Sequence, residues 1–92
     1  MKIVINGHKG GFYLTKEEMK RIGYTDREWR DVPRNDNGLV TAVELGIIDK
    51  TDDYRNLKIV TIPDNATDCG IISGGWSEYV IFVVNGKLDA VA

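Results

Sequence analysis

The sequence predicts an α+β fold: a small mixed sheet with an N-terminal parallel β-α-α-β crossover and a C-terminal antiparallel β-meander, with the helices on one face. Two short runs rich in β-branched residues, at residues 2–6 and 57–62, are separated by segments with helical signals. Residues 69–91 have the pattern of consecutive strands joined by glycine-containing turns. A chain of 92 residues has room for a single domain, residues 1–92.

The chain begins with a strand and a glycine-rich loop. Residues 2–6 form an apolar run with polar ends, which is typical of a buried strand. Residues 7–11 contain three glycines in five positions, so the backbone there can adopt positive φ or pass close to another group. This loop also carries His8, the one histidine of the sequence.

The clearest helix signal follows this loop. Thr15 and Glu18 have the spacing of a capping box, in which each side chain accepts a hydrogen bond from a free backbone N–H of the first turn. Leu14 and Met19 are spaced to pack together as a hydrophobic staple, and Gly23 stands where a helix usually ends. A helix this short is marginal alone, so it is expected to dock through its apolar face.

Two further helical segments are predicted before the second strand. Residues 25–28 form a second capping-box pattern, which predicts one helical turn that carries Trp29. Asp36 is a candidate N-cap for a helix over residues 39–45, and Gly46 supplies its left-handed end. The apolar stripe of this helix is predicted to be core, and its members are Leu39, Val40, Val43 and Ile47.

The strands complete the predicted sheet. Since only helices and loops separate residues 2–6 from 57–62, these two strands are expected to pair in parallel through a right-handed crossover. The meander is predicted from strands at 69–72, 76–84 and 87–91, and the Asn85-Gly86 pair between the last two is a strong hairpin signal. On the long strand, one face is expected to carry Trp76, Glu78, Val80, Phe82 and Val84, and the other Ser77, Tyr79, Ile81 and Val83. Because the helices cover one face, the other is a candidate surface for protein binding or self-association.

Charge and composition exclude several partners. The net charge is −2, divided between eight basic and five acidic residues in 1–34 and four basic and nine acidic residues in 35–92. The basic residues of the first part are interleaved with acidic ones, which favours a solvated, ion-paired face over an anion site. An acidic chain is not expected to bind nucleic acid. No apolar run approaches a membrane span and no signal peptide is evident, so neither membrane binding nor export is expected.

Catalytic signals are weak, and no cofactor and no metal site are predicted. A single histidine provides no His-based metal cluster and no evident Ser-His-Asp set. Cys69 is the one cysteine and is expected to pack in a strand as a small apolar residue. We therefore predict a protein that is not an enzyme.

The glycine-rich loop remains a candidate ligand site, because a strand, a glycine turn and a helix can bind an anion. It matches neither the P-loop spacing nor the dinucleotide-binding spacing, so its glycines can equally serve only to turn the chain. If a ligand binds, we expect its partners to be Asn6, His8, Lys9, Gly10, Gly11, Phe12, Arg30 and Arg34.

Four segments carry a family resemblance. They are MKIVIN at 1–6, GGFYLT at 10–15, RNDNGLVTAVELG at 34–46 and LKIVTIP at 57–63. In this order they resemble a family of small, uncharacterised proteins of tailed bacteriophages and prophages. The chain departs from that family at Asn37, where a proline is usual, and in its closing segment. The resemblance implies a phage origin and location in the host cytoplasm, but no particular chemistry.

Two functions follow as hypotheses. In the first, a counter-defence or host-takeover protein sequesters a nucleotide-type signal, with the loop and the arginines on its phosphates and Phe12, Tyr13 or Trp29 stacked on its base. In the second, an inhibitor binds a host or defence protein through the apolar face of residues 76–91. A structural accessory protein that assembles as a homo-oligomer is a third possibility.

Overall fold

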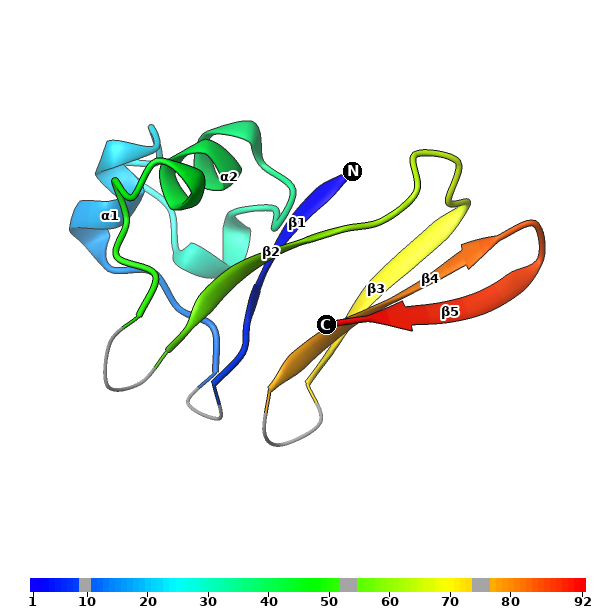
Figure 1. The fold of residues 1–92 in the computed structure, drawn as a ribbon. Helices are drawn as coiled ribbons and strands as arrows, with labels where there is room; N and C mark the ends of the chain where they lie inside the picture. Colours follow the sequence, from blue (N-terminus) through cyan, green and yellow to red (C-terminus); the bar gives the residue numbers. More distant parts are fainter. Residues whose placement is uncertain (9–10, 52–54, 74–76) are drawn as a thin grey trace.

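Two antiparallel sheets and a group of short helices are stacked as three layers in the computed structural model (Figure 1). The structure describes residues 1–8, 11–51, 55–73 and 77–92. In chain order the elements are β1 (Lys2–Asn6), α1 (Lys16–Arg21), the 3₁₀ turn η1 (Trp29–Asp31), α2 (Asn37–Glu44), β2 (Leu57–Thr61), β3 (Asp68–Ser73), β4 (Glu78–Val84) and β5 (Lys87–Val91). The small α and β architecture predicted from sequence is therefore present, with a different sheet arrangement.

The predicted parallel crossover is wrong, because β1 and β2 pair antiparallel. Lys2 lies opposite Thr61 and Asn6 opposite Leu57. The chain leaves β1 and enters β2 at the same end of the pair, where the Gly7 N–H donates to the Asn56 carbonyl at 2.8 Å. β-branched runs are equally typical of both strand directions, so only the point at which the chain returns decides between them.

The single mixed sheet is also replaced by two sheets, β1–β2 and β3–β4–β5. The β1–β2 pair is buried on both sides. Val4 and Leu57 pack into a core with α1 and α2, whereas Ile3, Ile5 and Val60 pack against β4. The helices therefore cover the face of β1–β2 that is turned away from β4, and β1 is the buried strand that its composition predicted.

α1 begins and ends as the sequence predicts. The Glu18 N–H donates to the Thr15 hydroxyl and the Thr15 N–H donates to the Glu18 carboxylate, which completes the capping box. Gly23 has φ of 90°, a conformation that side-chain-bearing residues rarely adopt. Beyond it the Tyr24 N–H donates to the Met19 carbonyl at 2.9 Å, the bond that closes a Schellman motif.

The predicted helical turn that carries Trp29 is present, but its capping box, expected at residues 25–28, lies three residues later. The capping box forms between Glu28 and Asp31, and the helical turn begins at Trp29. Trp29 packs partly buried against the core, with its ring centroid 5.8 Å from that of Phe12. This aromatic contact places the turn where the indole reaches the core, and the capping pattern alone does not specify that position.

α2 uses the predicted N-cap and the predicted stop. The Leu39 N–H donates to the Asp36 carboxylate at 3.0 Å, and Gly46 has φ of 75°. The expected burial of Ile47 is wrong, since it is 47% exposed while Ile48 is fully buried. After the left-handed glycine the chain reverses, which turns the second isoleucine rather than the first toward the core.

The C-terminal meander is confirmed. Asn85 and Gly86 both have positive φ and join β4 to β5, and Val84 lies opposite Lys87. The expected alternation on β4 holds: Val80 and Phe82 are buried, whereas Tyr79 is 37% exposed. The covering layer is β1–β2 and not the helices, which corrects the prediction of helices on this face.

For two residues of the predicted meander, Cys69 and Trp76, the sequence expectation is not confirmed. Cys69 lies in β3 but is exposed, so it is not the packed apolar residue that was expected. Trp76, expected at the start of the long strand, lies outside the described residues.

Replacing Asp36 with Ala is expected to lower the free energy of unfolding by about 1–2 kcal/mol, because the α2 N-cap is lost. The same carboxylate accepts a 2.7 Å hydrogen bond from the Tyr24 hydroxyl, which adds to the loss. Thr41→Ala, at an exposed position of α2, is the control. It should change the free energy of unfolding by less than about 0.5 kcal/mol. Urea unfolding followed by circular dichroism measures both, and equal values for the two variants would contradict the capping role.

Candidate functional site

The glycine-rich loop is held at its start by Asn6, which is fully buried. The Asn6 side-chain oxygen accepts from the N–H groups of Asn56 at 2.7 Å and His8 at 3.2 Å, and its amide donates to the His8 carbonyl at 2.9 Å. The Asn6 amide therefore joins the loop to Asn56, the residue before β2. Its hydrogen bonds are used within the fold.

The remaining loop residues are only partly described. His8 and Gly11 are half-buried, and Lys9 and Gly10 lie outside the described residues. Gly11 has φ of 83° with nothing within 4 Å of an added Cβ, so a larger residue would be opposed by backbone strain and not by crowding. The glycine at this position is thus needed for the turn itself.

The partly buried Arg34 packs on the buried ring of Phe12. The Arg34 guanidinium lies 3.5 Å from the centroid of the Phe12 ring, and Phe12 is only 6% exposed. Arg34 donates to both carboxylate oxygens of Glu78 at 2.8 Å, and the Asn6 N–H donates to the same carboxylate at 2.8 Å. These contacts join three segments: β1, the chain before α2, and β4. Glu78 also balances the charge of Arg34.

Arg30 occupies a separate, exposed position. Its guanidinium lies 4.5 Å from the centroid of the Trp29 ring and 3.4 Å from the Glu28 carboxylate. The structure therefore brings Asn6, Phe12 and Arg34 into one network, through contacts within the protein, and places Arg30 on the outer side of Trp29.

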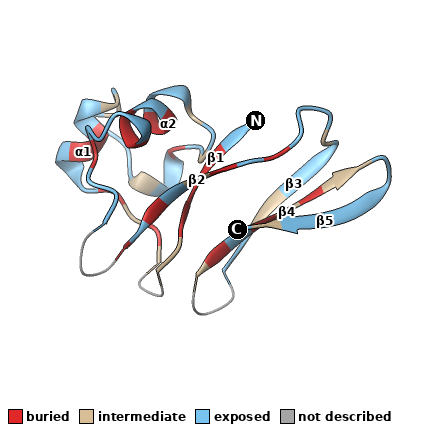
Figure 2. Cartoon of the chain, viewed as in Figure 1, coloured by how far each residue is buried: buried red, intermediate tan, exposed pale blue. Residues whose placement is uncertain are grey.

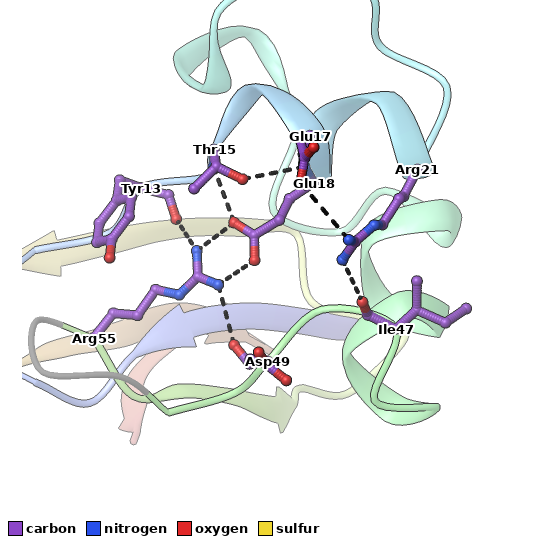
Figure 3. Close-up of polar contacts among 8 residues, drawn as sticks. All are labelled: Tyr13, Thr15, Glu17, Glu18, Arg21, Ile47, Asp49 and Arg55. Carbon is purple, nitrogen blue, oxygen red and sulfur yellow. Dashed lines mark hydrogen bonds and ion pairs between the residues drawn. The ribbon is translucent and has the colours of Figure 1, made fainter.

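A second buried ion pair was not predicted from the sequence. Arg55 and Glu18 are 2% and 7% exposed and form a two-point ion pair between α1 and the chain before β2 (Figure 3). Arg55 also donates to the carbonyls of Tyr13 at 2.9 Å and Asp49 at 3.1 Å. The two partners are 37 residues apart, so no local spacing could reveal their contact.

The Glu18 carboxyl has a lowered pKa. Burial alone would raise this pKa, but the hydrogen bonds from Arg55 and from the Thr15 N–H, together with the charge of Arg55, outweigh burial. Glu18 therefore stays ionised in the fold. Because Glu18 is fully engaged with Arg55 and Thr15, these contacts account for its lowered pKa.

One apolar surface of the described chain faces outward. On the sheet β3–β4–β5, the side opposite β1–β2 leaves Leu88 70% exposed and Ile72 and Tyr79 each 37% exposed. The exposed positions of β3 and β5 are visible in Figure 2. We name this surface the outer face, and its apolar residues are Ile72, Tyr79, Ile81, Val83, Leu88 and Ala90, with Asp68 and Gly70 on the same side of β3.

Within residues 1–8, 11–51, 55–73 and 77–92, no three His, Cys, Asp or Glu side chains are placed to hold a metal ion. In the same part of the chain, no helix has the length and apolar character needed to cross a bilayer.

Comparison with known proteins yields no relative. No protein-family model matches the chain, and no curated protein or solved structure matches it significantly.

Replacing Glu18 with Gln is expected to lower the free energy of unfolding at pH 7 by about 3–5 kcal/mol, because Arg55 keeps its charge in a buried site. In the parent protein, the ionised Glu18 carboxylate contributes its full stabilisation above the ordinary glutamate pKa of 4.5. This contribution disappears as the pH falls through the lower pKa that Glu18 has in the folded state. The difference between variant and parent should therefore shrink in acid.

Glu17→Gln is the matched control, since Glu17 is the neighbouring residue with a side chain 84% exposed. It should change stability by less than about 0.5 kcal/mol at any pH. Thermal unfolding between pH 3 and pH 8 measures all three proteins. A difference for Glu18→Gln that is constant across this range would contradict the assignment.

Proposed function

We propose that this chain is a small binding protein that docks on a partner protein through the outer face of the sheet β3–β4–β5. The observation that supports the proposal is the contrast between the two sides of this sheet. Val80 is fully buried against β1–β2, whereas Leu88 on the other side is 70% exposed. Apolar side chains gathered on one open sheet face are typical of protein interaction surfaces.

The composition of the outer face suits a protein partner. Tyr79 offers a large ring with a polar tip, and Ile72 lies opposite it on β3, whereas Leu88 lies on β5 opposite Val83, further along the same face. Aromatic residues in such positions frequently contribute most of the binding energy of an interface. Their strand-borne placement also keeps them ordered before binding, which lowers the entropic cost of association.

The contacts of the loop residues favour the outer face over the glycine-rich loop as the binding surface. Arg34 is neutralised by Glu78, and Phe12 is buried beneath it. A phosphate at Arg34 would compete with a bidentate carboxylate, and a base has no open Phe12 ring to stack on. Sequestration of a nucleotide-type signal is accordingly the second candidate, and it depends chiefly on the residues around Lys9.

In biological terms, the proposal is a phage-encoded inhibitor of a host or defence protein that acts in the host cytoplasm. This setting comes from the sequence resemblance to tailed-phage proteins. Binding without catalysis suits it, because an inhibitor needs only a complementary surface.

A position-specific cross-link is expected to distinguish the outer face from other exposed apolar positions. Leu88 and Leu45 are both 70% exposed, but Leu45 lies at the end of α2, away from the outer face. A photoreactive residue at position 88, in host cells, should form a covalent adduct with one partner protein, and the same residue at 45 should not. Adducts of equal yield from both positions would contradict the proposal.

Two single variants provide the matched competition test. Added before illumination, Leu88→Lys should fail to reduce the yield of the cross-linked adduct, because a charge would be buried at the interface, whereas Leu45→Lys should compete like the parent protein. Both substitutions are at exposed positions, so circular dichroism should show unchanged folds. Light scattering on the purified protein identifies the alternative outcome in which the partner is a second copy of the chain.

Native mass spectrometry tests the second candidate. If the protein acts through the outer face, protein purified from host cells should carry no retained small molecule. A surplus mass of a few hundred daltons, lost on denaturation and reduced by Lys9→Glu, would instead establish the nucleotide hypothesis.

A further inference from the structure

A groove lies on the open side of the two stacked sheets, between β1 and β3. Its volume is about 340 Å³. Its walls are mainly apolar, and they include Met1, Ile3, Ile71 and Val80, with Arg34 and Asn35 at the β1 side. This groove is distinct from the outer face, which lies on the other side of the sheet β3–β4–β5.

The two strands that border the groove differ in their backbone. At β1, the Val4 N–H donates to the Arg34 carbonyl at 2.8 Å, and Arg34 donates to the Val4 carbonyl at 3.2 Å. The β1 edge is therefore already occupied at Val4. β3 is an edge strand of its sheet, with β4 on one side only.

The strand register shows which groups of β3 face away from β4. In the two-residue hairpin, Val84 and Lys87 form the closing hydrogen-bonded pair, so Phe82 also hydrogen-bonds toward β5. Cys69, which lies opposite Phe82 on β3, must then direct its N–H and carbonyl outward, and so must Ile71. An outward row of backbone groups beside an apolar groove is the arrangement that accepts an added strand.

The charge of the groove restricts its occupant. Arg34 is the cation that lines it, and the two oxygens of Glu78 already balance this charge at 2.8 Å. Among the described residues, an anionic ligand would find no basic side chain there without a carboxylate partner. An uncharged, apolar side chain fits the groove best.

We propose that an extended, uncharged peptide segment of a partner protein adds as a strand to the free edge of β3 and places alternate apolar side chains in this groove. The peptide backbone pairs with Cys69 and Ile71. Because the side chains of an extended strand alternate in direction, every second one enters the groove toward Ile3 and Val80.

Asp68 controls access to this edge. Its carboxylate accepts from the outward N–H of Cys69 at 2.9 Å, and an incoming peptide carbonyl must replace it. The β5 edge has the same arrangement, since Asp89 accepts from the Ala90 N–H at 2.8 Å. The hollow beside β5 differs, however, because charged Lys87 and Asp89 line it.

Selection from a displayed library of random decapeptides, with the full chain as bait, tests the proposal. We expect enriched peptides in which apolar residues alternate with uncharged polar ones. Amide resonances of Cys69 and Ile71 should shift on titration with a selected peptide. No enrichment, enrichment of acidic residues at the alternating positions, or shifts confined to other strands would overturn the proposal.

N-methylation of the selected peptide separates strand addition from simple apolar adhesion. Only alternate peptide N–H groups face β3, so methylation of one alternate set should abolish binding while methylation of the other set should preserve it. Equal effects of the two sets would overturn the pairing.

Protein variants supply the last comparison. Asp68→Ala should tighten peptide binding roughly threefold to tenfold by freeing the Cys69 N–H, and Asp89→Ala, the matched change at β5, should leave it unchanged. Leu88→Lys should bind the peptide like the parent, so the strand-addition site and the outer face can fail independently. Loss of peptide binding in Leu88→Lys, or equal effects of the two aspartate changes, would overturn the assignment to β3.

Discussion

The fold depends on one constraint, which is that the short strand pair β1–β2 is apolar on both faces and must be covered on both. Val4 and Leu57 on one face require the helices, and Ile3, Ile5 and Val60 on the other require β4. Two strands of five residues cannot be stable alone. The helical layer and the C-terminal sheet therefore exist as the two covers of this pair, and neither has another large apolar surface to pack against within the described residues.

Polar contacts then hold these layers in register. Arg34 and Glu78 connect the chain before α2 to β4, and the Asn6 N–H joins the same carboxylate. Arg55 and Glu18 connect the chain before β2 to α1. Buried pairs of this kind add little net stability compared with apolar residues, but they are costly to break because one charge would remain without its partner. They restrict how the three layers can shift.

This use of charge leaves the two proposed binding surfaces mainly apolar. Of the two arginines expected to bind phosphate, Arg34 is balanced by Glu78, so the two proposed surfaces rely on different chemistry. The outer face offers exposed side chains, and the β3 edge offers backbone groups beside an uncharged groove. Both belong to the C-terminal sheet, whose inner side is the only one that the fold needs for its core.

Local signals in the sequence determined most of the caps and turns. The Thr15 and Asp36 caps, the glycine stops at Gly23 and Gly46, and the Asn85-Gly86 hairpin all form, because each depends on neighbouring residues. The sequence also placed Tyr79 and Ile81 on the outward side, since strand alternation is local too. Only the tertiary structure decided the antiparallel β1–β2 pair, the two-sheet arrangement and the pairing of Arg34 and Arg55 with distant glutamates. The physical reason is the same in each case. Strand direction and ion-pair partners depend on where the chain returns in space, and residue spacing does not encode that return.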